Sequence, residues 1–373
     1  MRLYHTQEYN SEKHYDEDVY AQLQHLKHEM HENNAAVKMQ RFFPEGFLFQ
    51  NALYGLTWSE LVSPKTHASI KQEALKEIDW ALSEMSSTNG TQIFSENLPL
   101  NYGVFYRGWS NYLLAKRVSI EGDSSLLHLL DQNCIDIEKA LGNFERPYLE
   151  SYSNACWPAD NILALASLDI ANELLENKYG GTQDNWIVAV KSHLDENGLI
   201  PHSTDFITGN TQQMARGNSQ SLMLCLLWDI DSNFAQLQFD IYKEQFVDSR
   251  LGLPGIRENR KGLGGNGDVD SGPVIWGIGG AASVVGQKTM AQYGEWDIYE
   301  GLRNSVETFG AAYTVNGKKK YVFGSLPMAD AFIAWSNVSA TEAEIQSSNW
   351  RWKFQLISLG VGFILFWLIR KLK

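Results

Sequence analysis

The feature that most constrains the fold is an alternation between two kinds of helical segment. Residues 161–180 and 220–230 are apolar on nearly every face, which is typical of helices buried inside a domain. Residues 67–85, 124–144 and 182–196 carry one apolar stripe with charged residues opposite. Apolar inner helices that alternate with amphipathic outer ones predict an all-α fold, an α/α toroid built as a closed ring of helical hairpins. An irregular helical bundle is the alternative.

Few segments have the pattern of strands, and no strict sequence repeat is present. The two candidates for strands are residues 318–325 and 91–95. The helix at 124–144 should begin at its two serines and stop at Gly142.

Composition and charge exclude several classes of protein. The chain has 373 residues, of which 44% are hydrophobic and 20% charged, as expected for a folded protein with a large core. Its formal net charge of -13, without any stripe of Lys and Arg, excludes nucleic acid as a partner and favours solubility. Cys134, Cys156 and Cys225 form no CxxC motif or Cys/His cluster, so neither a metal site nor a cofactor is predicted. Nothing in the sequence indicates an oligomeric state.

The end of the chain predicts a membrane anchor. Between Phe354 and Ile369 the only polar side chains are Gln355 and Ser358. The aromatic and basic residues on both flanks suit the interface, so the run can cross a bilayer core that needs ~20 apolar residues. We therefore expect a catalytic toroid domain at 1–340, a polar linker at 341–352 and a transmembrane anchor at 353–373. The alternative is an amphipathic or buried terminal helix.

The side of the membrane follows less directly from the sequence. Basic residues stand on both sides of the apolar run, so the positive-inside rule gives no direction. The polar N-terminus lacks the pattern of a signal peptide. The simplest topology leaves the large domain in the cytoplasm; the alternative places it outside and needs a separate export route.

Polar residues gather just before each predicted inner helix. In a toroid, the connections at one end surround a central pocket, so these residues should point into it. The same layout recurs at six places, which predicts that the domain is an enzyme. The six segments are residues 44–55, 102–112, 152–161, 198–221, 255–280 and 324–336.

The segment 152–161 groups Cys156, Asp160 and Asn161 at a helix entry marked by Pro158. A thiol near a helix N-terminus can have its pKa lowered by the helix dipole, so Cys156 is a candidate nucleophile or proton donor. The alternative is that Cys156 is a small buried side chain. The candidate substrate contacts in this segment are Tyr152, Asn154, Trp157, Asp160 and Asn161.

The segment 198–221 supplies a second candidate acid or base, His202, because histidine titrates near neutral pH. Asp205 shares its loop. Arg216 and Asn218 open the following helix and suit a holder for a carboxylate or an oxyanion. The alternative for His202 is an ordinary surface position.

The segment 255–280 combines six glycines between Gly255 and Gly272 with four charged residues, which suits close approach to a ligand. Asp268 and Asp270 should raise one another's proton affinity and act as general acid and base. The pattern matches neither a calcium loop nor a dinucleotide fingerprint. Capping of a helix by Asp is the alternative. The substrate contacts expected here are Arg257, Glu258 and Trp276.

The other three segments place a charged residue beside aromatic ones. The expected substrate contacts in them are Glu45, Tyr106, Arg107 and Asp330. The predicted catalytic set is Cys156, His202, Asp268 and Asp270, and we expect it to converge on one cavity with Arg216 and Asp330.

The sequence NACWPADN resembles the inner-helix entry of linalool dehydratase/isomerase and its relatives. The residues that carry the resemblance are Cys156, Pro158, Asp160 and Asn161. It implies an α/α barrel that uses Cys, His and Asp side chains for proton-driven dehydration and double-bond shifts on a hydrophobic alcohol. That family has a second cysteine about three turns further on, where this chain has Leu165 and Ala166.

The leading functional hypothesis is therefore a membrane-tethered lyase or isomerase that acts on a lipophilic small molecule. The first alternative is a carbohydrate-active hydrolase or epimerase, with Asp268, Asp270 or Glu258 as acid and base and Trp faces stacking on sugars. The second alternative is a non-catalytic scaffold with an aromatic pocket.

Overall fold

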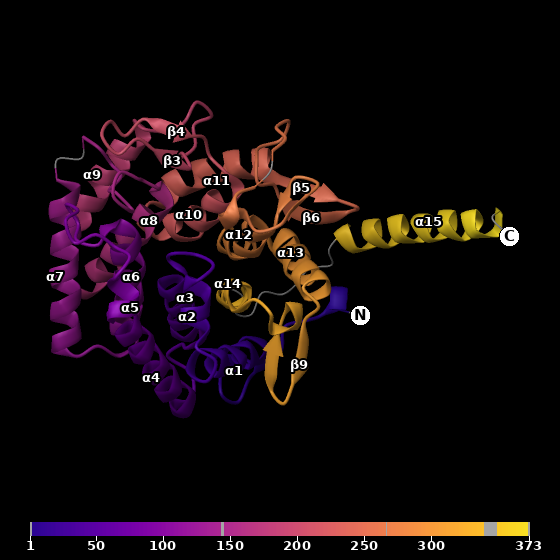
Figure 1. Ribbon diagram of the computed structural model, residues 1–373, viewed down its shortest axis with the longest axis horizontal. Helices are drawn as coiled ribbons and strands as arrows, with labels where there is room; N and C mark the ends of the chain where they lie inside the picture. Colours follow the sequence, from indigo (N-terminus) through magenta and orange to yellow (C-terminus); the bar gives the residue numbers. More distant parts are fainter. Residues whose placement is uncertain (1, 143–144, 266, 339–348, 372–373) are drawn as a thin grey trace.

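The computed structural model describes residues 2–142, 145–265, 267–338 and 349–371. Six inner helices form a closed ring within it (Figure 1). Each inner helix packs against the next, and the last closes against the first. In ring order they are α3 (Gly46–Leu61), α6 (Gly103–Glu121), α8 (Pro158–Leu174), α10 (Gly217–Ile230), α12 (Gly280–Gln292) and α14 (Pro327–Asn337).

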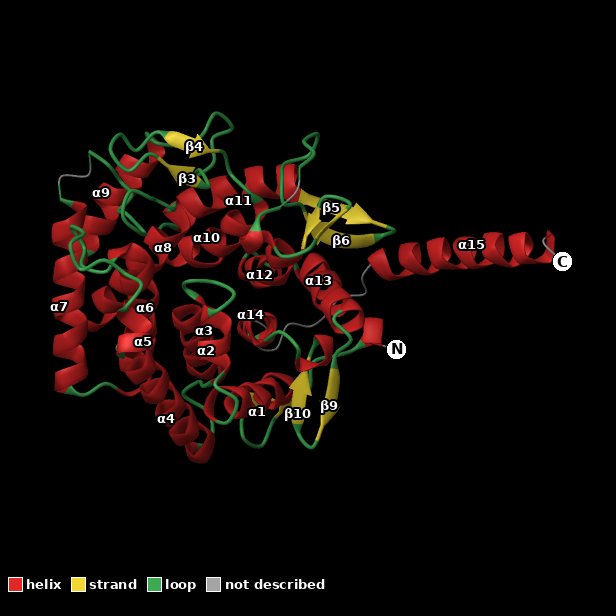
Figure 2. Ribbon diagram, in the orientation of Figure 1, coloured by secondary structure: helices red, strands yellow, loops and turns green. Residues whose placement is uncertain are grey.

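An outer helix precedes each inner helix along the chain and covers the ring from outside (Figure 2). The predicted α/α toroid is therefore confirmed. The outer helices are α1 (Glu17–His31), α4 (Ala68–Met85), α7 (Ser124–Leu141), α9 (Gly180–Lys191), α11 (Ser232–Phe246) and α13 (Trp296–Phe309). Two short helices, α2 (Ala35–Gln40) and α5 (Thr88–Thr91), lie in the connections.

Aromatic side chains fill the inside of the ring. The ring of Phe49 on α3 lies 4.9 Å from those of Phe105 and Trp109 on α6 and 5.6 Å from that of Phe332 on α14. Trp109 also meets Trp335 edge to face. Because these aromatic side chains occupy the centre of the toroid, space for a ligand is left at the two ends of the toroid rather than along its axis.

Helix ends agree with the sequence in outline and differ in detail. Asp123, rather than either serine, caps α7 by accepting hydrogen bonds from the backbone N–H groups of Ser125 and Leu126. Gly142 ends α7 as expected, with a φ of +60°. The helix expected at 161–180 runs instead from Pro158 to Leu174, and Gly180 begins α9.

Within the described residues, ten short strands form five two-stranded antiparallel hairpins, more than the sequence predicts. The strand expected at 318–325 covers only Lys318–Lys320, and the one expected at 91–95 is wrong, since α5 ends at Thr91. The pairs are β1 (Tyr9–Asn10) with β2 (Tyr15–Asp16), β3 (Ser203–Thr204) with β4 (Thr211–Gln213), β5 (Val247–Arg250) with β6 (Leu253–Ile256), β7 (Val274–Ile275) with β8 (Ile278–Gly279), and β9 (Tyr313–Val315) with β10 (Lys318–Lys320). Three 3₁₀ helices are η1 (Arg2–Tyr4), η2 (Val269–Ser271) and η3 (Val322–Gly324).

The last helix, α15 (Asn349–Lys371), projects from the edge of the ring (Figure 1). Its segment Trp350–Lys371 has 22 residues and is long and apolar enough to cross a membrane. At ~1.5 Å per residue it spans about 33 Å, against ~30 Å for a bilayer core. Residues 349–352 belong to this helix, so the linker predicted at 341–352 is wrong there. Residues 339–348 lie outside the described part of the chain.

The first two turns of α15 pack on the domain. Trp350 is 7% exposed and forms a small apolar cluster with Leu3 and Leu253. Arg351 forms an ion pair with Glu300 on α13. From residue 356 onward the helix is exposed.

This division predicts different outcomes for two truncations. Removal of residues 357–373 should leave the free energy of unfolding of the domain unchanged, because residues 357–371 are exposed. Removal of residues 350–373 should lower the free energy of unfolding by about 2 kcal/mol, since burial of Trp350 is lost. Urea denaturation followed by circular dichroism measures both, and equal stability of the two truncated proteins would contradict the packing.

Candidate functional site

The six inner helices begin without a side-chain cap. Among the described residues, none of the N-cap side chains of α3, α6, α8, α10, α12 and α14 accepts a hydrogen bond from its own helix. Four of the outer helices, in contrast, are capped by Asp or His. Uncapped N–H groups carry partial positive charge, so this end of the ring is suited to oxygen-bearing groups.

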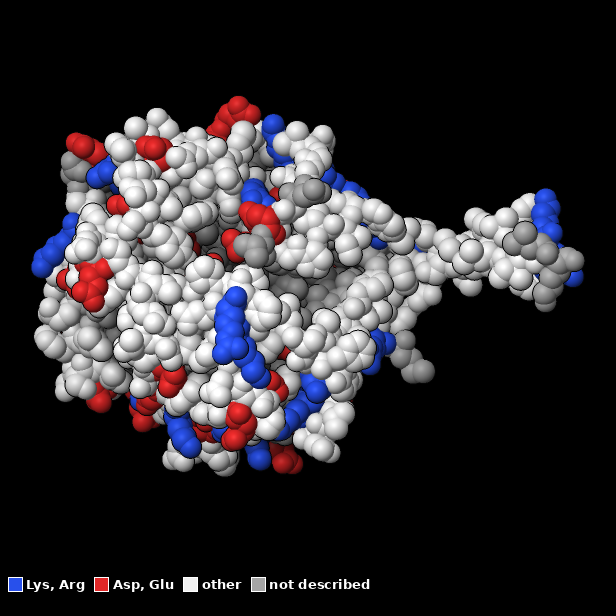
Figure 3. All heavy atoms as spheres, in the orientation of Figure 1, with Lys and Arg blue, Asp and Glu red and all other residues white. Residues whose placement is uncertain are grey.

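One face of the ring is hollowed near its centre, and acidic side chains lie at the edge of the hollow and inside it (Figure 3). Three carboxyl groups from different parts of the chain lie close enough here to shift one another's pKa. They are Glu45 before α3, Asp160 in the first turn of α8 and Asp270 in η2. We call these three residues the carboxyl cluster.

Asp160 is the most perturbed member of the carboxyl cluster. It is 7% exposed, and burial raises its pKa to about 7. A hydrogen bond from Ser151 opposes this shift, whereas the charges of Glu45 and Asp270 reinforce it. Burial likewise raises the pKa of Glu45, and the charge of Asp270 adds to it. A carboxyl group that is half protonated near neutral pH can donate a proton to a substrate.

Arg216 lies close enough to Asp270 to affect its pKa, and it connects three other residues. Its Nε donates to Glu258 Oε1 at 3.0 Å, its Nη2 donates to Ser271 Oγ at 2.8 Å, and its Nη1 forms an ion pair with Asp268. Glu258 is fully buried. Arg216 therefore binds carboxylates as expected, but they are those of Glu258 and Asp268 in the chain itself. These contacts connect the start of α10 to η2.

The two aspartates of η2 behave oppositely, which corrects the expectation that they raise one another's pKa. Desolvation acts to raise the pKa of Asp268, but the charge of Arg216 and hydrogen bonds from Ser271 outweigh it and leave the pKa lowered. Asp268 also caps η2 in a capping box with Ser271. Desolvation raises the pKa of Asp270, and the charge of Asp268 adds to it. Asp268 is thus an ionised structural group, and Asp270 is the member free for chemistry.

His202 lies beside this arrangement but is held neutral. It is 6% exposed, and its Nδ1 lies 3.0 Å from Ser219 Oγ. Burial lowers its pKa to about 4, and the charge of Arg216 lowers it further, against a smaller opposing effect of Asp268. At neutral pH the imidazole therefore has no proton to give as an imidazolium acid.

Cys156 does not have the acidic thiol that its position at a helix entry predicts. Its side chain is 2% exposed, and its Sγ donates to the carbonyl oxygen of Leu149 at 3.1 Å. Burial raises its pKa to about 12, so the expected lowering by the helix dipole is wrong. Asn161 is also fully buried and bonds both the N–H and the carbonyl oxygen of Leu149. The two side chains brace the loop that carries Ser151 and Tyr152.

Two residues expected in the cavity turn away from it. Arg107 reaches outward to α7, where it bonds Asp136 at 3.0 Å and Asn133 at 3.1 Å. Asp330 accepts a hydrogen bond from the backbone N–H of Tyr321 at 2.8 Å and lies 3.6 Å from His25 on α1. Both predictions of substrate contact are wrong, because these side chains hold inner helices to their neighbours.

Loop residues account for three further corrections. Arg257 pairs with Asp248 and donates to the carbonyl oxygens of Asn259 and Leu263, so it fixes the glycine-rich loop. Asp205 caps the turn between β3 and β4 through the N–H groups of residues 207 and 208. Asn154 is an exposed turn residue with a φ of +63°.

The aromatic and amide candidates divide between the site and the surface. Tyr152 stacks on Phe105 at 5.5 Å and meets Trp157 edge to face, and Asp160 is among the charges that raise the pKa of its hydroxyl, after burial. Tyr106 is buried one layer behind. Trp276 is 67% exposed in the turn between β7 and β8. Asn218 accepts a hydrogen bond from the N–H of Ser219 at the start of α10.

The sequence did not reveal the serines that complete the site. Ser151 bonds Asp160, and Ser271 bridges Arg216 and Asp268. Ser271 follows the two aspartates directly, so its place in a capping box could have been recognised from the spacing D-x-x-S.

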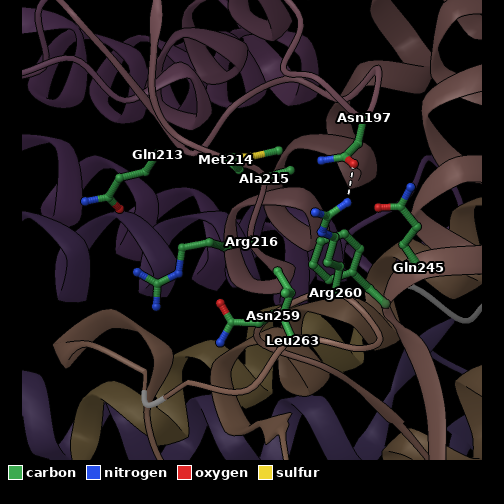
Figure 4. A pocket seen from close by; sticks show the side chains of 10 residues that line it. Asn197, Gln213, Met214, Ala215, Arg216, Gln245, Asn259, Arg260 and Leu263 are labelled. Carbon is green, nitrogen blue, oxygen red and sulfur yellow. Dashed lines mark hydrogen bonds between the residues drawn. The ribbon is translucent and has the colours of Figure 1, made fainter.

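A separate pocket of about 300 Å³ lies next to the Arg216 backbone and not at the carboxyl cluster (Figure 4). Amide side chains from Asn197, Gln213, Gln245 and Asn259 line it, and Arg260 is bound to Asn197. We place the chemistry at the carboxyl cluster, because the lining of this pocket includes no carboxyl group.

No protein-family profile and no curated protein match the chain. Among solved structures it is similar to an unsaturated glucuronyl hydrolase specific for heparin, with 12% identity over 78% of this chain and 85% of the other, and a TM-score of 0.50. It is also similar to a GH76 α-mannanase of Bacteroides thetaiotaomicron (10% identity, 78% and 86% covered, TM-score 0.49) and to a D-mannose isomerase (13%, 78% and 86%, TM-score 0.47). At these identities the likeness concerns the fold. The fold is an α/α toroid.

The different roles of Asp268 and Asp270 predict stability effects of different size. Asp268→Ala should lower the free energy of unfolding by about 2 kcal/mol, because a helix cap and an ion pair to Arg216 are both lost. Asp270→Ala should change it by no more than about 0.5 kcal/mol, because its carboxyl group bonds none of the described residues. Urea denaturation of both variants tests this, and equal losses would show that Asp270 also braces the loop.

The raised pKa of Asp160 predicts a dependence of stability on pH. Between about pH 4 and pH 7 the folded protein holds a proton on Asp160 that the unfolded chain has released, so this contribution to stability falls as pH rises. Asp160→Asn removes that loss, and the variant should be more stable than the wild type at pH 8 by on the order of 2 kcal/mol. Near pH 4 the two should be equally stable. Denaturation at both pH values is the measurement, and a variant that is less stable at pH 8 would contradict the burial argument.

Proposed function

We propose that this chain is a membrane-anchored, carbohydrate-active enzyme in which Asp160 acts as the general acid. The observation that carries the proposal is the buried carboxyl group of Asp160, which has a pKa of about 7 and shares the end of the ring with Glu45 and Asp270. The fold shared with an unsaturated glucuronyl hydrolase specific for heparin supports a sugar substrate. An isomerase or epimerase on a sugar would instead need a base that takes a proton from carbon.

The proposed chemistry divides roles according to environment. Asp160 is kept partly protonated by burial, so it can protonate the oxygen of the bond that breaks. Asp270 is exposed and can reach water, so we assign it as the base; desolvation and the charge of Asp268 raise its pKa, and Arg216 opposes that rise. Tyr152 and Trp157 offer ring faces beside Asp160 on which a sugar can stack.

The predicted dehydratase-like lyase on a lipophilic substrate stays a prediction. It implies proton transfer through a cysteine, whereas the Cys156 thiol is buried and bonded to a backbone carbonyl. The carboxyl cluster requires no such group, which is why we favour the sugar. The non-catalytic scaffold stays a second alternative. A scaffold would still bind its ligand after Asp160 is replaced.

The membrane part of the proposal depends on α15. Its segment Trp350–Lys371 can span a bilayer by length and composition, and basic residues end it at Arg370 and Lys371. The cytoplasmic position of the domain stays a prediction.

Activity assays test the catalytic assignment. A panel of oligosaccharides, with unsaturated heparin disaccharides included, would first identify a substrate that is turned over. Asp160→Asn should then lower kcat/KM by about 100-fold or more, because the proton donor is lost. In the wild type, kcat/KM should decline as pH rises through about 7, where Asp160 loses its proton.

Asp16 provides a matched control. It is also buried and has a pKa raised to about 7 by burial, but it caps α1 through the N–H of Val19. Asp16→Asn should therefore leave kcat/KM unchanged. Cys156→Ser should also retain turnover. A loss of turnover with Cys156→Ser as large as that with Asp160→Asn, at an unchanged melting temperature, would instead support the dehydratase-like reading.

A further inference from the structure

The hairpin of β5 and β6 has an unusual residue at its tip. Arg250 pairs with Leu253, so the turn consists of Leu251 and Gly252, with φ values of +53° and +83°. A two-residue turn with positive φ at both positions favours Asn-Gly, because a branched side chain is strained there. Leu251 is nevertheless 49% exposed, so no packing inside the domain accounts for it.

The chain contains a matched hairpin with the usual residues. In the hairpin of β9 and β10 the two turn residues are Asn316 and Gly317, with φ values of +52° and +73°. The backbone of the two turns is therefore alike at these positions. The difference lies in the side chain, since one tip presents an amide and the other an apolar group.

The β5–β6 tip lies against the start of α15. A Cβ added to Gly252 would lie 2.8 Å from the backbone nitrogen of Phe354. On the N-terminal segment, the hydroxyl of Tyr4 accepts a hydrogen bond from Gln355 Nε2 at 2.9 Å. Figure 1 shows the hairpin at the same edge of the ring from which α15 departs. We call Tyr4, Leu251 and Trp352 the collar, since the first two belong to the segments that contact the start of α15 and the third belongs to its first turn.

The collar has the composition of a membrane interface. Its three side chains are 47%, 49% and 54% exposed. Tyr and Trp prefer the headgroup level, and an exposed Leu beside them can enter the acyl boundary. Lys353 follows Trp352 directly and is exposed, so it can meet lipid phosphates.

We infer that the collar is a second membrane contact, which holds the domain on the bilayer interface in one orientation. This inference rests on the proposed anchoring by α15. It adds that the domain is held in one orientation relative to the membrane. α15 leaves within the plane of the ring as viewed in Figure 1. A bilayer that α15 crosses is therefore perpendicular to the plane of the ring. In this orientation the carboxyl cluster opens parallel to the membrane surface rather than toward the lipid.

Site-directed fluorescence on the full chain tests the inference. Leu251→Cys and the matched control Asn316→Cys are each labelled with an environment-sensitive fluorophore; Cys134, Cys156 and Cys225 are buried, so labelling favours the new thiol. The proteins are placed in vesicles of phosphatidylcholine and phosphatidylglycerol. The label at 251 should shift to shorter wavelength and be quenched several-fold more strongly by headgroup-level nitroxide lipid than the label at 316.

Two further measurements separate the outcomes. Flotation of the vesicles tests the anchor itself: a full chain that fails to float overturns both the anchoring and the collar. A chain that floats with a label at 251 as water-exposed as the one at 316 overturns the collar alone. A shift that follows protein concentration rather than lipid would assign the tip to a second copy of the chain, and would also overturn it. Tyr4→Cys probes the collar from a second position if the labelled tip lowers the melting temperature in detergent.

Discussion

Closure of the ring is the contact on which the rest of the structure depends. Gln50 on α3 donates to the carbonyl oxygen of Pro327 on α14 at 3.3 Å, and Trp335 on α14 donates to Glu60 on α3 at 3.1 Å. These bonds join segments that lie about three quarters of the chain apart. Without them the apolar faces of the inner helices would be open to water. The three carboxyl groups, which come from three distant segments, would then have no reason to meet.

The architecture was predictable because burial leaves a direct trace in the sequence. A helix buried on all sides must be apolar on all sides, so segments such as 220–230 identified the inner ring. Side-chain direction left no such trace. Asp160 is the third residue of α8 and Asp330 the fourth of α14, and each follows a proline that opens its helix. One residue is about 100° of rotation, since a turn takes 3.6 residues, so one aspartate joins the carboxyl cluster and the other faces α1. The two patterns differ by one residue, and the packing of each helix decides which neighbour that rotation makes the side chain face.

The same limit applies to charge. Proximity in sequence suggested that Asp268 and Asp270 would act as a pair, but a distant residue, Arg216, decides their difference by binding only one of them. Likewise the dipole at the start of α8 would lower the pKa of a nearby acid, yet burial dominates for Asp160 and Cys156. Six uncapped helix starts and a buried acid each lower stability relative to a capped, neutral design. Their concentration at one end of the ring is what we expect where selection acts on chemistry rather than on stability.

The position of α15 bears on the kind of substrate. An anchor is often explained by a substrate that dissolves in the bilayer, and such a substrate would be delivered most directly to a site that opens toward the lipid. Here the helix leaves from the edge of the ring, and the hollow with its acidic side chains opens on the face of the ring (Figures 1 and 3). A lipid would have to leave the bilayer along the side of the domain before it turned into the site, and its apolar tail would then meet carboxyl groups that offer it no favourable contact. A polar chain that lies along the membrane surface reaches the same opening directly, and its hydroxyl groups can satisfy the carboxyl oxygens. Anchoring in this geometry therefore favours a surface-bound or freely diffusing sugar over a membrane-dissolved one.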